Sequence, residues 1–181
     1  DYAFAQIDSA RRAQIRVHHT SAHLLQAALI KVLGDEVKQA GSQVEENRMR
    51  FDFTFSRAMT PQEVKKTEDI MNKWIGEKLP VNTDVMGIEE AKLTGATALF
   101  GEKYEDVVRV VSIGGKAKCN CGSDCSCDHE SGEEKEVISK EFCAGTHASN
   151  TADLRLVKIV SEGAIAAGTR RIEAVVALSL I

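Results

Sequence analysis

The stretch H-H-T-S-A-H-L-L, residues 18–25, places His19 and His23 four positions apart at the start of an apolar run. Residues i and i+4 of a helix lie on one face with their side chains directed the same way, so two imidazoles at this spacing can bind one cation. Apolar residues continue at helical spacing as far as Gly34. This pattern predicts a helix over residues 19–33, with both histidines in its first turns.

A second pair of potential metal ligands occurs far along the chain, in the stretch C-A-G-T-H that runs from Cys143 to His147. The residues between them are small, and Gly145 can take a positive φ, which suits a tight turn that directs a thiolate and an imidazole to one point. Three imidazoles and one thiolate form a typical zinc ligand set. The sequence therefore predicts that one Zn²⁺ is bound by His19, His23, Cys143 and His147.

Two histidines lie outside these motifs. His18 lies about 100° around the helix from its neighbour, so we expect it to contact a ligand residue or to face solvent rather than to bind the metal. His129 lies next to a group of cysteines described below.

The remaining patterns predict an α+β fold. Alternation of apolar and polar residues predicts a hairpin over 42–55, and T-P-Q-E at 60–63 forms a capping box that opens a helix ended by Pro80. The other predicted elements are a short helix from the Asp8 cap to residue 17, strands at 81–86, 107–113, 137–142, 154–160 and 171–178, and a short helix at 89–94. Such an order is typical of an antiparallel sheet with helices packed on one face.

Length and composition indicate an ordinary globular chain. The 181 residues are 43% apolar and 28% charged, which is enough for one core, so we expect a single domain over residues 1–181. No apolar run reaches 18 residues and the start shows no signal-peptide pattern, so we expect a cytoplasmic protein without a membrane partner.

The net charge of −4 argues against binding nucleic acid through bulk electrostatics. The charge is uneven, because residues 119–136 contain six acids and one lysine, which leaves about +1 for the rest of the chain. A modest basic face is therefore expected from five arginines: Arg11, Arg12, Arg16, Arg170 and Arg171.

Longer blocks around the motifs resemble the editing domain of alanyl-tRNA synthetase. The likeness extends to freestanding alanyl-tRNA trans-editing proteins and, more distantly, to the editing domain of threonyl-tRNA synthetase. It runs from about Ile7 to Val176 with one gap, and one departure is Ala144, where that family usually has a second glycine. The blocks that carry it are R-V-H-H-T-S-A-H-L-L-Q-A-A-L-I-K-V-L-G, Q-A-G-S-Q-V, R-M-R-F-D-F, T-G-A-T-A-L-F-G-E-K-Y, S-K-E-F-C-A-G-T-H-A-S-N-T and E-G-A-I-A-A-G-T-R-R-I-E-A-V.

The resemblance implies hydrolysis of tRNA(Ala) that is mischarged with serine or glycine. An apolar pocket separates such small side chains from alanine by only about 1–3 kcal/mol, so a second, hydrolytic site corrects the error. Zinc could lower the pKa of a bound water, polarise the ester carbonyl or hold the substrate amino group. Because four protein ligands fill a tetrahedron, we favour a positioning role; a purely structural zinc is the other interpretation.

The resemblance also points to polar residues after the histidine helix. Gln39, followed by Gly41 and Ser42, is expected to face the same cleft and to read a serine hydroxyl, and a solvent-exposed glutamine is the alternative. Thr20, between the ligand histidines, is a second catalytic candidate, or only a helix cap. The competing function is a noncatalytic, zinc-stabilised tRNA-binding module that works with the rest of an alanyl-tRNA synthetase chain.

The gap in the resemblance falls at about residues 115–137, which read as an acidic, cysteine-rich insertion. Its motif C-x-C-x3-C-x-C could hold a second, soft metal ion, or it could be an acidic loop of reduced thiols. The loop is the interpretation that we favour. The thiols concerned are Cys119, Cys121, Cys125 and Cys127.

Overall fold

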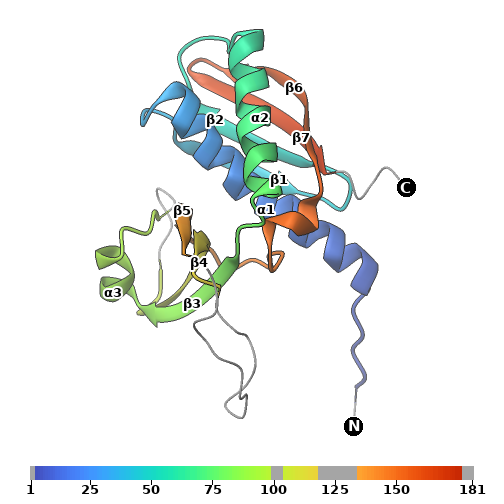
Figure 1. The fold of residues 1–181 in the computed structure, drawn as a ribbon, viewed down its shortest axis with the longest axis vertical. Helices are drawn as coiled ribbons and strands as arrows, with labels where there is room; N and C mark the ends of the chain where they lie inside the picture. Colours follow the sequence, from blue (N-terminus) through green and yellow to red (C-terminus); the bar gives the residue numbers. More distant parts are fainter. Residues whose placement is uncertain (1–2, 99–103, 118–133, 177–181) are drawn as a thin grey trace.

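The computed structural model describes residues 3–98, 104–117 and 134–176. Figure 1 shows a four-stranded sheet with two long helices beside it, and a smaller sheet that forms a second lobe. In chain order the elements are α1 (Ser9–Leu33), β1 (Gln39–Val44), β2 (Met49–Thr54), α2 (Pro61–Gly76), β3 (Val81–Gly87), α3 (Ile88–Leu93), β4 (Val107–Gly115), β5 (Lys135–Phe142), the 3₁₀ turn η1 (Thr151–Leu154), β6 (Val157–Ala166) and β7 (Thr169–Val176).

The N-terminal helix α1 is continuous, whereas the sequence predicted two helices divided near residue 18. Asp8 caps it by accepting a hydrogen bond from the Arg11 N–H, and the Gly34 N–H closes the other end on the Ile30 carbonyl. No glycine or proline interrupts the stretch between, so a single helix satisfies more backbone groups than two. The predicted helix end at Gly34 is confirmed.

Helix α2 begins as the sequence predicts. The Thr60 hydroxyl accepts from the Glu63 N–H, and the Glu63 carboxylate accepts from the Thr60 N–H, which completes the capping box with Pro61 in the first turn. The helix ends at Gly76, shortly before Pro80.

The larger sheet has the strand order β1-β2-β7-β6, with antiparallel pairing throughout. Its inward side chains pack with α1 and α2 in the main core, which includes Leu25, Leu29, Phe51, Phe53 and Ile172. Period-two alternation in β2 follows from this arrangement, because one face of the strand meets the helices and the other carries charged residues.

The smaller sheet has the order β3-β4-β5, also antiparallel, and packs with α3 around Val108, Val110 and Phe142. The α+β class is thus confirmed, although the strands divide between two sheets where the sequence predicted one. The predicted strand at 154–160 starts later, because residues 151–154 form η1 and β6 begins at Val157.

The predicted insertion leaves the smaller sheet at the β4–β5 connection, where Gly115 pairs with Lys135. Its four cysteines and His129 lie outside the described residues, so a second metal site there stays a prediction. Among the described helices, none is long and apolar enough to span a membrane.

Candidate metal centre

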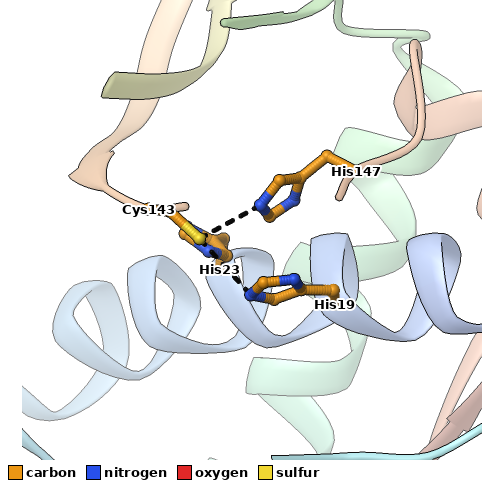
Figure 2. Close-up of side chains that lie close together, drawn as sticks. All are labelled: His19, His23, Cys143 and His147. Carbon is orange, nitrogen blue, oxygen red and sulfur yellow. Dashed lines mark hydrogen bonds between the residues drawn. The ribbon is translucent and has the colours of Figure 1, made fainter. Parts of the chain in front are cut away.

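The helical half of the site lies on α1. His19 is partly exposed and His23 is buried, and both point from the same face of the helix toward the loop that follows β5 (Figure 2). Their ring centroids are 5.3 Å apart, as the i, i+4 spacing predicts.

The second half lies on the loop after β5. Cys143 follows the last residue of the strand, and His147 lies four residues further on, in a segment without regular secondary structure. The Cys143 Sγ lies 3.5 Å from His19 Nε2 and 3.3 Å from His147 Nε2. The loop therefore brings its thiol directly over the helical histidines, as Figure 2 shows.

The four side chains fit a metal ion. Their donor atoms all lie within 4.8 Å of one another, although they come from segments some 120 residues apart. A tetrahedral zinc with bonds of about 2.0–2.3 Å has ligand atoms roughly 3.3–3.8 Å apart, and the two sulfur–nitrogen distances given above fall in this range. The cluster of three imidazoles and one thiol is consistent with zinc.

Gly145 is required by a close approach rather than by its backbone angle. A Cβ atom built at this position would lie 2.0 Å from Cε1 of His19, a distance that real contacts do not reach. Among the described glycines, those with positive φ are Gly34, Gly95, Gly114, Gly115 and Gly168. The predicted positive φ at Gly145 is therefore wrong, and the absent side chain is what lets the loop pack over the histidine ring.

Arg109 of β4 anchors the loop that carries Cys143 and His147. Its Nη1 donates to the carbonyls of Ala144 and Gly145, at 2.7 and 2.8 Å, and its own carbonyl accepts from the Cys143 N–H at 3.0 Å. These bonds satisfy the backbone carbonyls of a loop that lies outside any helix or strand.

Thr20 connects the helix to the far end of the loop. Its fully buried hydroxyl accepts from the Ala148 N–H at 3.0 Å and lies 3.2 Å from His147 Nδ1. When Nε2 binds a metal ion, Nδ1 carries the proton and donates to this oxygen. Thr20 does not cap α1, and its contacts favour orienting His147; the predicted catalytic role stays a prediction.

Glu141 plays a similar part for His23. Its Oε2 lies 3.1 Å from His23 Nδ1, and its Oε1 accepts from the Ser139 hydroxyl at 2.7 Å. The Nδ1 atom has no aligned hydrogen-bond partner among the described residues, so the contact is chiefly electrostatic. Burial would lower the pKa of His23, but the neighbouring carboxylate raises it to about 10.

The pKa values of the two side chains on the loop shift in the direction opposite to that of His23. Burial by itself would raise the pKa of the Cys143 thiol, but hydrogen bonds from His147, His19 and His23 lower it to about 3. Burial lowers the pKa of His147 to about 4. The thiol is thus held as a thiolate and His147 as a neutral imidazole, which are the forms that bind a metal.

His18 belongs to the core rather than to the site. It is fully buried, its Nδ1 lies 3.0 Å from the Gln14 carbonyl, and its Nε2 accepts from the Val176 N–H at 3.3 Å. Burial lowers its pKa, in keeping with a neutral ring between α1 and β7. The expected position, beside a ligand or in solvent, is therefore wrong.

A small cavity of about 60 Å³ adjoins the cluster on one side. Gln39 and Ser42 line it together with three of the cluster residues, and the Gln39 Nε2 donates to the Ser42 hydroxyl at 3.1 Å. This cavity is far smaller than the roughly 300 Å³ of a typical ligand pocket, so it suits one small group rather than a whole ligand.

A cavity of about 700 Å³ adjoins the other side, where His147 and Thr146 form part of its wall. Its wall also carries three arginines against one acid, Asp153; the arginines are Arg16, Arg109 and Arg155. Arg155 adopts a φ of 58°, an uncommon backbone conformation for a residue with a side chain. Among the described residues, no acidic side chain pairs with Arg16 or Arg155.

The basic face predicted from five arginines is wrong in part. Arg11 pairs with Glu46, Arg170 with Glu162 and Arg171 with Asp52, so three of them are neutralised by acids. Arg16 is the member of that group that lines the large cavity.

Three residues around the cluster escaped the sequence analysis: Gln26, Arg109 and Glu141. Gln26 follows His23 by three positions on the same helix face, and Glu141 precedes Cys143 by two positions in a strand, so periodicity could have placed both near the site. No local pattern marks Arg109, because its contact with the loop depends on the pairing of β4 and β5.

Fold and site together define an α+β domain with a candidate metal centre, to which a helix and a distant loop each supply two potential ligands. Residues 108–173 match the family described as the threonyl and alanyl tRNA synthetase second additional domain. The chain is also 48% identical over 171 residues to an alanine-tRNA ligase of Synechococcus sp. (strain JA-3-3Ab), an alignment that covers 94% of this chain and 17% of the relative.

The chain is therefore related to a segment of alanine-tRNA ligase, and its residues 108–173 carry the second additional domain described for threonyl and alanyl tRNA synthetases. It spans less than a fifth of the length of the relative that it matches.

Proposed function

We propose that the chain is an editing domain that deacylates tRNA(Ala) mischarged with serine or glycine, with zinc bound at the cluster, in the cytoplasm. The relationship to alanine-tRNA ligase supports tRNA(Ala) as the partner, together with the rest of a synthetase chain. The observation that carries the proposal is the position of the cluster between two cavities of very different size and charge.

The two parts of an aminoacyl-tRNA ester differ in size and charge as the two cavities do. Its amino acid is small and polar, which suits the cavity lined by Gln39 and Ser42, and its nucleotide is large and anionic, which suits the cavity lined by Arg16 and Arg155. A substrate that occupies both would place its ester beside the cluster residues, and orientation of this kind lowers the barrier to attack by water.

The chain's own residues would then select and hold the substrate. Gln39 has an amide oxygen and nitrogen that can exchange hydrogen bonds with a serine hydroxyl, although its nitrogen already donates to Ser42. A bound zinc ion would supply a positive charge that positions the ester or its amino group. Thr20, Glu141 and Arg109 would keep the ligands in place, and the narrow cavity would exclude larger side chains.

Deacylation of tRNA(Ala) charged with serine, glycine or alanine tests the proposal. We expect release of serine and glycine well above the spontaneous rate, and markedly less release of alanine. Gln39→Ala should reduce the rate on seryl-tRNA more than that on glycyl-tRNA, since only serine presents a hydroxyl. No release of either amino acid by the folded, zinc-loaded chain would contradict editing and would favour the noncatalytic tRNA-binding module.

A further inference from the structure

One residue in the wall of the small cavity has a side-chain oxygen without a hydrogen-bond partner among the described residues. Gln26 lies on α1 and is only 7% exposed. Its Oε1 is buried and accepts no hydrogen bond from any described residue. Buried amide groups are nearly always satisfied in folded proteins, so such an atom is expected to meet a group that arrives from outside.

The position of Gln26 determines what that group can contact. Gln26 follows His23 by three residues on the same face of α1, and both line the small cavity with Gln39. A ligand that reaches the cluster through this cavity therefore contacts the Gln26 side chain. The Gln39 nitrogen donates to the exposed Ser42 hydroxyl, whereas the Gln26 oxygen is a buried acceptor without a partner among the described residues.

The unpartnered acceptor in the wall favours a group that donates N–H bonds. The Glu141 carboxylate lines the same cavity, and the Cys143 thiol does so as well. The unpartnered side-chain oxygen of Gln26 complements a group that carries N–H bonds, and an ionised donor makes the stronger hydrogen bond. An ammonium group has three donors and no acceptor, and it fits the small volume.

We propose that Gln26 is a specificity-determining residue whose side-chain oxygen accepts a hydrogen bond from the α-ammonium group of the aminoacyl ester. This assignment rests on the proposed function, because it takes an aminoacyl ester as the occupant. Serine, glycine and alanine all carry this group, so Gln26 does not distinguish between them. It distinguishes esters with a free α-ammonium group from N-acylated ones, and the substrate side chain is recognised by other residues. A bulky N-acyl substituent would be excluded by the cavity of about 60 Å³.

Binding of two non-hydrolysable analogues tests this role without requiring catalysis. The first is 3′-deoxyadenosine with serine joined to a 3′-amino group by an amide bond, and the second replaces serine by 3-hydroxypropanoate, which lacks only the ammonium group. Calorimetry on the zinc-loaded chain should show a preference of about 10-fold or more for the seryl analogue, the usual size of a hydrogen bond to a charged group.

The variant Gln26→Met keeps a flexible side chain of similar length that favours helix but removes the acceptor. We expect it to lose the preference for the seryl analogue and to bind the deaminated analogue as the native chain does. Gln14→Met, which makes the same change three turns earlier on α1, should leave both affinities unchanged.

Equal weakening of both analogues by Gln26→Met would overturn the proposal and assign Gln26 to the packing of the cavity. An unchanged preference would overturn it as well, and so would failure of the native chain to bind either analogue. If Gln26→Met removes the preference but the native chain hydrolyses no aminoacyl-tRNA, the ammonium site stands and the deacylase function fails.

Discussion

His19 and His23 take their common direction from the backbone of α1, with Glu141 beside His23, whereas Cys143 and His147 lie on a loop that is positioned by contacts from β4 and α1. The helix satisfies its own backbone hydrogen bonds, so its half of the site is preformed. The loop depends on Arg109 and Thr20 for its geometry. A mutation in the loop or its supports should therefore change metal binding more than a mutation of similar cost in the helix.

The largest expected difference concerns charge in the metal-free protein. Because the pKa of Cys143 is lowered to about 3, its thiol should stay ionised as the pH falls from 9 to about 4. At pH 6 less than about 1% of an ordinary thiol is ionised, so the ionised fraction exceeds the ordinary one by more than about 100-fold. The corresponding contribution to stability is present above pH 9 and is lost as the pH falls through about 3.

Alkylation by iodoacetamide, followed by mass spectrometry of the peptide that contains Cys143, measures this ionisation separately from the other cysteines. The rate should be nearly level between pH 5 and 8, and zinc should suppress it. A rate that falls tenfold for each pH unit would show an ordinary thiol and would remove the charge difference between the two halves.

Gly145→Ala should weaken zinc binding by at least about 100-fold, because the added methyl group would occupy the place of the His19 ring. The backbone tolerates alanine, so the circular dichroism of the metal-free chain should not change. Ala144→Gly is the matched control in the same loop and should leave the affinity within about twofold. Native affinity in Gly145→Ala would mean that the loop does not pack over His19.

Thr20→Val should weaken zinc binding by about 10-fold to 100-fold, since it removes the hydrogen-bond partner of His147 and leaves the Ala148 N–H without an acceptor. Thr67→Val removes a buried hydroxyl that bonds within α2, and it should lower the melting temperature without changing zinc affinity. Equal effects of both variants on affinity would indicate a general loss of stability rather than orientation of His147.

Arg109→Met should weaken zinc binding by about 10-fold, because two loop carbonyls lose their donor while both remain near solvent. Competition with a chromophoric chelator measures the change. Arg57→Met removes an exposed ion pair with Glu63 on the larger lobe and serves as the control. If the two variants bind zinc equally, the loop holds its shape without Arg109.

Asp8→Ala should have the smallest effect on the site, although it removes the cap of α1. Loss of an N-cap costs about 1 kcal/mol, which lowers the melting temperature of a chain of this size by about 2–4 °C. Zinc affinity should change by less than about twofold, because the histidines lie three or more turns from the cap. A large loss of affinity would show that the helical half is no more autonomous than the loop half.

The sequence by itself determined the elements whose hydrogen bonds close within a few residues. The i, i+4 histidines, the Thr60 capping box and the alternation in β2 each depend on local geometry, so they could be predicted from spacing. The sequence also predicted that the C-x3-H and H-x3-H motifs lie together, because each supplies two of the four ligands that a tetrahedral zinc site needs.

Only the tertiary structure decided which side chains surround the cluster. Arg109 reaches the loop because β4 pairs with β5, and Gly145 is needed because the loop crosses a particular imidazole. The same holds for the division into two sheets, for the core position of His18 and for the side-chain oxygen of Gln26 that has no partner among the described residues. These features depend on contacts between residues far apart in the chain, and local periodicity carries no information about such distances.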